Sequence, residues 1–427
     1  MKKIMLIILL LPILSFPNWL DNIKNYIYDD SQYLIVLNNY NQTKENYFLK
    51  ETFLPSIMIT NGRYNYSKSD TSESSSINVP LRINAKIFDF DLSINSNFSN
   101  SLWDDWRDTY SLTISKEIFS ETDEEIINAR INLLNSKWNF LNTKNQLLIN
   151  YLNKGFNNFY YGQLYMIQEQ LFEYQKEDYE NNKIKYENGI ISKVEYLNSK
   201  KSYLNSQIML LDAKKNYEDY KEYNVDYQII DLTVPSSENI FNRPDVIAEQ
   251  LNVELKKMQK DRIYRLYIPD INTGITFDYN YPVQSNEKKL TTSVFVNFNY
   301  NLYDKGYREY QVEQIQNNLY IAKKDYEEKI NQLFDQYENM LKNLNTLELS
   351  LQSKMLDLEI KELNYEIYKE KYEKNMISKK DLEEKYLEYK QSKLSLEKVK
   401  FDIFVQKLNI YSFLGYDLIS LFEEEFK

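Results

Sequence analysis

The sequence predicts a mainly α-helical fold that carries amphipathic β-strands and is built from two copies of one unit. The first observation is that the 427 residues include only 7 Gly and 8 Pro. Few tight turns are therefore available, so the elements should be long. The second is a nine-residue motif that recurs 186 residues later in the chain. The third is that strongly alternating strands come before the long helical pattern in each copy.

Composition removes several classes of chemistry. The chain has no Cys and no His, which excludes disulfides, thiol nucleophiles, His-based acid–base catalysis and nearly every zinc or copper site. The formal net charge is −11, and removal of Lys2 and Lys3 with a leader would take it to −13. A chain with no basic patch is not expected to bind nucleic acid. We predict no catalytic residues, no cofactor and no metal site.

The N-terminus predicts export. Lys2 and Lys3 precede an apolar run from Ile4 to Leu14, followed by Ser15, Phe16 and Pro17. An apolar run of this length is typical of a secretory signal and is too short to span a membrane as a helix. We therefore expect a signal peptide over residues 1–17; the alternative is a helix buried in a core. Beyond it no apolar stretch approaches 18 residues, so a membrane role would have to come from β-strands.

The repeated motif divides the chain. The segments 185–193 and 371–379 are identical at six of nine positions, and Leu54-Pro55-Ser56-Ile57 is echoed by Ile268-Pro269-Asp270-Ile271. We predict a first structural repeat over residues 18–224, a linker over 225–243, a second repeat over 244–416 and a C-terminal tail over 417–427. The linker contains Pro235, and Pro244 stands at the start of the next helix, where proline is favoured.

Each copy is predicted to read in the same order of helix, strands, long helix, turn and return helix. The first helices cover about 21–53 and 244–267, and the strands about 55–117 and 269–303. The long helical hairpins cover about 122–222 and 308–414, with long helices at 122–187 and 308–374. Each long helix would reach about 100 Å at 1.5 Å per residue. Helices of that length need lateral, coiled-coil-like partners.

The strands carry the clearest local pattern. Val294, Val296 and Phe298 alternate with polar residues, and so do Ile275, Phe277 and Tyr279. Apolar and polar faces with a period of two, rich in Tyr and Phe, are typical of barrel strands that face lipid on one side and water on the other. The alternative is an amphipathic strand on a soluble core. Strands of about 10 residues next to such long helices, behind a signal, favour the membrane barrel.

The first copy is longer than the second. The distance from Pro55 to Gly189 is 134 residues, against 106 from Pro269 to Asn375, which leaves 28 additional residues. They are enough for one more hairpin, although the change of phase between Ile87 and Phe90 could also be a bulge in one long strand. Four to six strands cannot close a barrel, and an open edge in lipid leaves backbone groups unpaired. Several chains should therefore share one barrel.

This order of elements resembles the TolC-type outer-membrane efflux protein family over nearly the whole mature chain. Three groups of residues carry the resemblance: the repeated motif with Glu195 and Asp381, the strand-to-helix junction over 298–306, and the segment 406–415 near the end. Each motif is short, and their order and spacing over two copies make the composite specific.

The resemblance implies a homotrimeric α/β-barrel conduit with a shared barrel in the outer membrane of a Gram-negative-type cell. An α-helical tunnel would extend into the periplasm. Such a channel is not an enzyme. It gives passive exit to drugs, small molecules or secreted polypeptides, as in type I secretion. Its partners would be outer-membrane lipid, a periplasmic adaptor (membrane fusion) protein and an inner-membrane transporter.

The resemblance also places candidate sites at the helical tips. Asn188, Gly189 and Ile190 match the family's adaptor-contact motif, which has the form Val-Gly-Leu. Asn375 and Met376 occupy the second tip, which departs from the motif because it lacks Gly. A sharp reversal needs a residue with positive φ, which Gly and then Asn adopt most readily. A plain turn would explain Gly189 equally well.

Two acidic residues and one aromatic residue are the candidate entrance gate. Asp381 and Glu384 are three residues apart and share a helix face. In the resembling family this stretch forms acidic rings that narrow the entrance, whereas the alternative is a solvated face among Lys379, Lys380 and Lys385. Tyr372 matches an aromatic that helps to hold the entrance closed. The basic partner expected near it is Ile377 in this chain, so the closing network is not copied intact.

Other classes of protein fit parts of the sequence. An exported structural or adhesive coiled-coil protein would explain the helices and the signal but not the duplicated strands. A periplasmic adaptor would have one hairpin beside Gly-rich domains, whereas this chain has two hairpins and only 7 Gly.

Overall fold

The computed structural model describes residues 16–52, 56–59, 63–69, 72–87, 90–101, 105–119, 122–223, 229–281 and 289–425. The predicted signal over 1–17 therefore lies almost entirely outside the described residues. The chain forms two compact units. Unit 1 comprises residues 1–37, 138–243 and 330–427, and unit 2 comprises 38–137 and 244–329. Neither unit is a continuous segment, because the long helices pass from one unit into the other.

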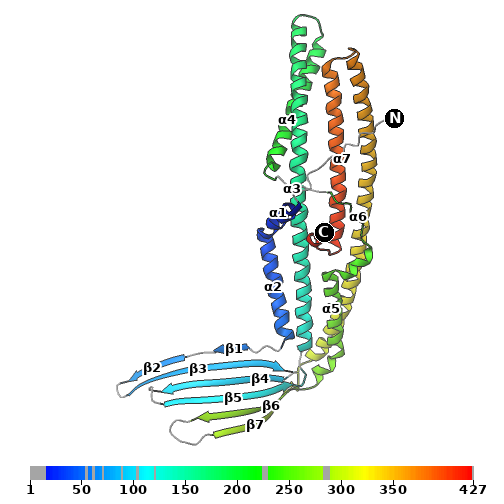
Figure 1. Cartoon of the computed structure of the whole chain (residues 1–427). Coiled ribbons are helices and arrows are strands. Elements are labelled where there is room, and N and C mark those ends of the chain that lie inside the picture. The colour runs from blue at the N-terminus through cyan, green and yellow to red at the C-terminus, as the bar shows by residue number, and fades with distance from the viewer. Residues whose placement is uncertain are drawn as a thin grey trace, which may run out of the picture. The chain divides into compact units, whose positions relative to one another are not determined.

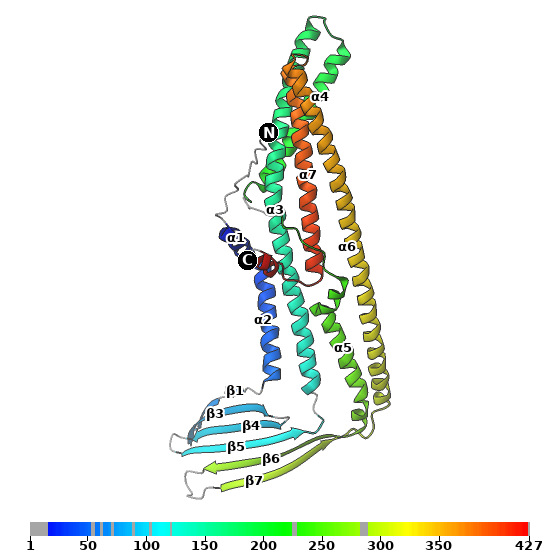
Figure 2. The ribbon, with the colours of Figure 1, turned by 45° about the vertical axis from the view of Figure 1, so that its right-hand side comes forward.

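Unit 1 is helical. It contains most of the two longest helices, α3 (Thr122–Glu187) and α6 (Tyr307–Glu373), and all of the helices that return from them, α4 (Lys193–Tyr220) and α7 (Lys379–Phe413). These helices run alongside one another in both views (Figures 1 and 2). The unit also includes α1 (Phe16–Tyr28), the 3₁₀ helix η1 (Ser237–Asn242) and α8 (Leu418–Glu425). No helix among the described residues is long and apolar enough to cross a membrane.

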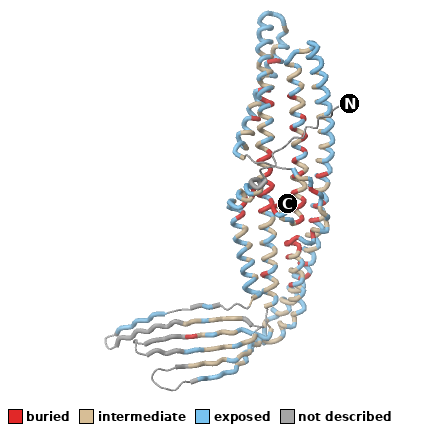
Figure 3. Tube along the Cα trace, viewed as in Figure 1, coloured by how far each residue is buried: buried red, intermediate tan, exposed pale blue. Residues whose placement is uncertain are grey.

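The core of unit 1 gathers where α1, α3, α7 and α8 meet, as the red segments near the C-terminus show (Figure 3). Phe156 of α3 stacks on Phe401 of α7 with ring centroids 4.0 Å apart and planes at 4°. Both rings are at most 2% exposed. Lys144 forms an ion pair of 2.7 Å with Asp417 beside this core. Apolar packing and one ion pair thus hold the C-terminal segment against the long helices.

The first predicted helix is divided in the structure. The sequence suggested one helix over about 21–53, whereas α1 ends at Tyr28 and α2 (Ser31–Glu51) begins after a break. The cause is Asp30, whose carboxylate accepts hydrogen bonds from the backbone N–H groups of Gln32 (2.7 Å) and Tyr33 (3.2 Å). A carboxylate in that position caps a new helix start. Likewise the second predicted helix is α5 (Pro244–Asp261) followed by the 3₁₀ helix η2 (Ile263–Tyr267).

Unit 2 combines one β-sheet with the helical segments that enter it. Ion pairs link those segments: Lys50 of α2 with Glu125 of α3 at 2.8 Å, and Arg262, which follows α5, with Asp123 at 2.8 Å. Lys329 of α6 contacts Asp245 of α5 at 3.2 Å. Ion pairs therefore connect the helical segments of this unit.

The sheet is antiparallel throughout, in the order β1-β3-β4-β5-β6-β7, with β2 paired to β3 (Figure 1). β1 and β2 pair with successive stretches of β3 and so occupy one lane of the sheet. The strands are β1 (Ser56–Ile59), β2 (Arg63–Ser69), β3 (Ser72–Ile87), β4 (Phe90–Ser101), β5 (Asp105–Glu117), β6 (Asp270–Tyr281) and β7 (Lys289–Asn299).

The additional residues of the first copy form a hairpin. β3 and β4 pair from Ser76 opposite Ser101 down to Ile87 opposite Phe90. β3 and β4 are therefore two paired antiparallel strands, and the alternative of a bulge in one long strand is wrong.

The two faces of the sheet differ in character: one is mainly apolar and the other mainly polar. One row of register partners crosses all lanes with Ile57, Ile83, Ile94, Leu112, Phe277 and Thr292. The adjacent row on the opposite face holds Asn84, Ser93, Thr113, Thr276 and Ser293. The Thr113 and Thr276 hydroxyls lie 3.2 Å apart in this polar row. The alternation predicted from the sequence is thus present across the whole sheet.

The predicted order of elements is confirmed. In each copy, helices lead to strands, then to a helix of 66 or 67 residues, a turn and a return helix. The predicted long helix over 122–187 is α3, and the one predicted over 308–374 is α6 (Tyr307–Glu373).

Candidate functional site at the helical tips

The two tips of unit 1 have the same backbone, although their sequences differ. Gly189 has φ +71° and Asn375 has φ +53°. At the first tip, Ile190 N–H donates to the Lys185 carbonyl at 2.8 Å and Gly189 N–H to Tyr186 at 2.9 Å. At the second, Met376 N–H donates to Lys371 at 2.9 Å and Asn375 N–H to Tyr372 at 2.9 Å.

This pair of bonds is the Schellman motif, which satisfies the last carbonyls of a helix and needs a left-handed residue. Asn is the non-Gly residue that adopts this conformation most readily. The second tip therefore keeps the turn geometry without glycine.

The return helices also begin in the same way. Ser192 accepts a hydrogen bond from the Glu195 N–H while the Glu195 carboxylate accepts from the Ser192 N–H at 2.8 Å. Ser378 and Asp381 repeat this reciprocal pair, with 3.0 Å from Ser378 N–H to the Asp381 carboxylate. Both are capping boxes, which satisfy the free N–H groups of a helix start.

Hydrogen bonds from Ser378 lower the pKa of Asp381 below its usual value of 3.8, and bonds from Ser192 likewise lower the pKa of Glu195. Asp381 is therefore ionised throughout the neutral range.

The predicted docking residues lie together at each tip and are exposed. Asn188, Gly189 and Ile190 are exposed at the end of α3, and Asn375 and Met376 at the end of α6. The Ile190 side chain is 69% exposed and that of Met376 is 71% exposed. Each of these apolar residues directly follows the positive-φ residue of its tip. The two tips thus present equivalent apolar side chains on equivalent backbones.

The predicted gate residues occupy two elements. Asp381 and Glu384 are both exposed in the first turns of α7, whereas Tyr372 stands in the last turn of α6 with 38% of its surface exposed. The Tyr372 carbonyl takes part in the tip turn described above. Ile377, at the place of the expected basic partner, is half-buried.

Contacts between α3 and α7 near the tips were not predicted from the sequence. Lys380 forms an ion pair with Asp178 at 2.9 Å, and the Tyr174 hydroxyl donates a hydrogen bond to Glu383. Burial and the bond to Glu383 raise the pKa of Tyr174 to about 12. These partners are 202 and 209 residues apart in the chain, so no local pattern could have identified them.

Stacked tyrosines lie between the two helices of both hairpins. Between α3 and α4, Tyr186 stacks on Tyr196 with centroids 4.9 Å apart, and Tyr179 stacks on Tyr203 at 5.2 Å. Between α6 and α7, Tyr365 stacks on Tyr389 with centroids 6.0 Å apart, and Lys361 forms an ion pair with Glu388 at 2.9 Å. The abundance of tyrosine in the sequence is thus partly explained by stacking along both hairpins.

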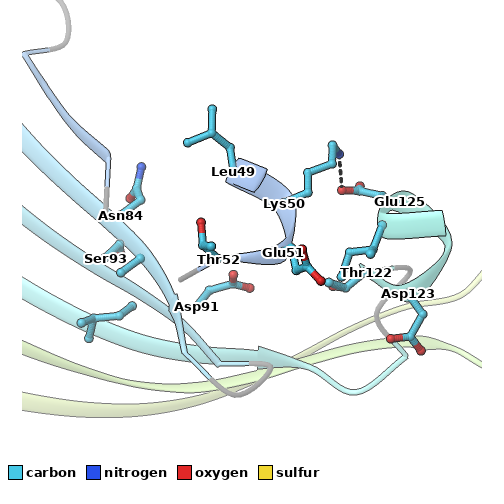
Figure 4. Close-up of a pocket in the computed structure, with 13 residues that line it drawn as sticks. Leu49, Lys50, Glu51, Thr52, Asn84, Asp91, Ser93, Thr122, Asp123 and Glu125 are labelled. Carbon is cyan, nitrogen blue, oxygen red and sulfur yellow. Dashed lines mark hydrogen bonds and ion pairs between the residues drawn. The ribbon is translucent and has the colours of Figure 1, made fainter. Parts of the chain in front are cut away.

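A cleft of about 560 Å³ lies in unit 2, where the end of α2, strands β3 and β4 and the start of α3 meet (Figure 4). Lys50 and Glu125 form their ion pair beside it (Figure 4). Glu51, Asp91 and Asp123 add further carboxylates. Within the described ranges, no group of three or more such side chains is arranged to hold a metal ion. We interpret the cleft as a solvated junction between helices and sheet.

Comparison with solved structures identifies the fold. The Campylobacter jejuni CmeC outer membrane channel is similar with a TM-score of 0.63 at 14% identity, over 96% of this chain and 89% of that chain. The open state of the Neisseria gonorrhoeae MtrE outer membrane channel has a TM-score of 0.62 at 12% identity, over 94% of this chain and 90% of that chain. The outer membrane protein VceC from Vibrio cholerae has a TM-score of 0.61 at 11% identity, over 93% of this chain and 96% of that chain. The chain has the fold of outer-membrane channel proteins, as the resemblance to the TolC-type family predicted.

No protein-family model matches the sequence, and no curated protein matches it.

Proposed function

We propose that the chain is a subunit of a homotrimeric outer-membrane channel of the TolC type, without catalytic activity. In this proposal the sheets of three copies form one barrel in the outer membrane, and their long helices extend into the periplasm. The channel gives passive exit to drugs, small molecules or secreted polypeptides that an inner-membrane transporter delivers.

The observation that carries this proposal is the sheet. One face is mainly apolar and the other mainly polar from lane to lane, as the Ile83–Ile94–Leu112 and Asn84–Ser93–Thr113 rows illustrate. A soluble protein would have to cover the apolar face. In a barrel, lipid covers that face while water contacts the other. The likeness to solved outer-membrane channels supports the same assignment.

The tips support a docking role. An adaptor that is itself built from repeated units would meet two equivalent surfaces on each chain, one centred on Ile190 and one on Met376. Exposed apolar side chains of this kind are typical anchors when a partner covers them. We therefore propose Asn188, Gly189, Ile190, Asn375 and Met376 as the contacts for a periplasmic adaptor protein.

We further propose that Asp381 and Glu384 form the entrance gate, with Tyr372 beside them. Three copies would bring three carboxylates of each kind around one axis, where they attract cations. The hydrogen bonds of the capping box favour the ionised form of Asp381, which is the form that this role requires.

Fractionation tests the channel, and block by multivalent cations tests the gate. We expect the protein in the outer-membrane fraction as a trimer that conducts ions in planar bilayers; a soluble periplasmic monomer would overturn the proposal. The double variant Asp381→Asn, Glu384→Gln should weaken block about tenfold or more, because charge near the axis is lost. Asn still offers a carbonyl oxygen to the Ser378 N–H, so the cap is preserved.

The matched control is Glu195→Gln, which removes one carboxylate from the equivalent capping box of the first tip. Block should be unchanged in this variant. Equal block in the double variant and the unmodified channel would refute the gate while leaving the channel intact.

A further inference from the structure

The sheet of unit 2 is wider than the internal repeat accounts for. The second copy supplies the two strands β6 and β7, whereas the first copy fills four lanes, namely β1 with β2, then β3, β4 and β5. Two strands from each copy would give four lanes, and the sheet has six. The additional hairpin is hydrogen-bonded along its whole length, with β4 paired to both β3 and β5.

The two edges of this sheet have open hydrogen-bonding sides. Among the described strands, β7 pairs only with β6, and β1 and β2 pair only with β3. An edge in lipid leaves its backbone N–H and C=O groups unsatisfied, which is strongly unfavourable because no water is present to bond them. In a membrane each edge must therefore find another strand.

The number of lanes makes the two edges complementary. Neighbouring strands are antiparallel at every step, so in a sheet of six lanes the first and last strands run in opposite directions. The β7 edge of one copy can thus pair antiparallel with the β1 and β2 edge of the next.

The faces would also continue across such a junction. On the apolar face of β7, Val294, Val296 and Phe298 are 73%, 62% and 76% exposed. On the other edge, Ile57 and Tyr64 are 67% and 61% exposed. Ile57 shares a register row with Thr292 through Ile83, Ile94, Leu112 and Phe277, so both edges carry the apolar residues on one side.

We propose that each copy contributes all six lanes to the shared barrel and that the β7 edge of one copy pairs with the β1 and β2 edge of a second copy. This inference rests on the proposed trimeric channel and goes beyond it in the number of strands. Three copies then close a barrel of eighteen strands, which would be about 36 Å across for a strand spacing of about 4.8 Å and a tilt of about 40°. Four lanes from each copy would give twelve strands and about 24 Å.

Paired cysteines can test the number of lanes, because the natural chain contains no Cys. Cysteine is a small apolar residue that fits a lipid-facing position. The row from Ile57 to Thr292 offers one position in each lane. Oxidation of the full-length protein in its membrane should link each neighbouring pair within one chain: Ile57→Cys with Ile83→Cys, Ile83→Cys with Ile94→Cys, Ile94→Cys with Leu112→Cys, Leu112→Cys with Phe277→Cys, and Phe277→Cys with Thr292→Cys.

A pair of cysteines in the first and last lanes tests the junction between two chains. Ile57→Cys should link to a Cys scanned along Leu290, Thr292, Val294 and Val296 of another chain, and the product should run as a covalent dimer and trimer on a denaturing gel. If Ile94→Cys links to the scanned β7 positions of another chain instead, four lanes form the barrel and the inference is wrong. If no pair links two chains and the protein is monomeric, the proposed trimeric channel also fails.

Polymer labelling provides a second measurement that does not depend on disulfide geometry. Ser111 lies near the middle of β5 on the polar face, between Asn95 and Asp278. After allowance for side chains, an eighteen-strand barrel leaves a lumen about 25 Å wide and a twelve-strand barrel one about 14 Å wide. Ser111→Cys should therefore react with a maleimide polymer about 20 Å in diameter added from outside. Reaction with a small maleimide but not with this polymer would overturn the wider barrel.

Discussion

A charge placed on the apolar face of the sheet should destabilise the protein, whereas the same charge on the opposite face should not. Leu112 of β5 lies between Ile94 of β4 and Phe277 of β6 in the apolar row. At about 3.4 Å per residue and a tilt of about 40°, it lies about 18 Å from one end of β5 and about 13 Å from the other. That is near the centre of an apolar band about 25 Å tall.

Leu112→Lys should therefore lower the free energy of unfolding by about 2–4 kcal/mol, the range for Lys at the middle of the bilayer. The folded-to-unfolded ratio would fall about 30- to 1,000-fold. Ser111→Lys is the matched control, because residue 111 is adjacent in sequence and points to the other face, beside Asp278. Its cost should stay within about 0.5 kcal/mol. Leu112→Ala separates the loss of packing from the insertion of charge.

The assay is urea titration of the protein refolded into lipid vesicles, in which the free energy of unfolding falls linearly with denaturant. The reasoning is refuted if Leu112→Lys is as stable as Ser111→Lys. A reversed order, with Ser111→Lys the less stable of the two, would mean that the polar face is the one that is covered.

The remaining predictions concern the helical unit. Phe401→Ala should cost about 3–5 kcal/mol, because a buried ring stacked on Phe156 is lost; chemical denaturation followed by circular dichroism measures this, and a loss under about 1 kcal/mol would contradict the assigned core. Ser378→Ala should lower the local stability of the first turn of α7 by about 1 kcal/mol and make amide hydrogen exchange there faster. Unchanged exchange would contradict the assigned cap. The pKa of Asp381 is lower in the folded state, so its contribution to the stability of the first turn of α7 is present at neutral pH. That contribution is lost as the pH falls below 3.8, the usual pKa of an aspartate, and amide hydrogen exchange in this turn should then become faster. Exchange protection that does not change with pH would argue against the lowered pKa.

The long elements were the part of the fold that the sequence predicted well. The helix predicted over 122–187 matches α3 because it contains no Pro and its two glycines, Gly155 and Gly162, do not end it. The helix ends at the Schellman turn around Gly189. Alternation identified the strands because one face is polar at nearly every position. Both signals are local and repeated many times, so they tolerate single exceptions.

Prediction failed where a single polar side chain decides the structure. Asp30 divides the first helix by capping a new start, but an aspartate within a helical pattern is equally compatible with an exposed helical position. The α3–α7 contacts of Asp178 with Lys380 and of Tyr174 with Glu383 depend on helix rotation and register over about 200 residues of separation. No pattern within one helix contains that information.

The second tip shows how far a motif can change while its geometry is kept. The sequence departs from the family pattern by placing Asn375 where the first tip has Gly189, and this departure alone would cast doubt on a docking role for the second tip. The two tips nevertheless share the positive φ, the pair of closing hydrogen bonds and the capping box that begins three residues after the positive-φ residue. Asn adopts the left-handed region at only a small conformational cost. At Gly189 open space surrounds the position of a Cβ, so a side chain there would meet no other atom. The turn therefore requires a residue that tolerates positive φ rather than glycine as such. What the two repeats keep in common is the exposed apolar residue that follows, Ile190 or Met376, and this is the property that a docking partner would recognise.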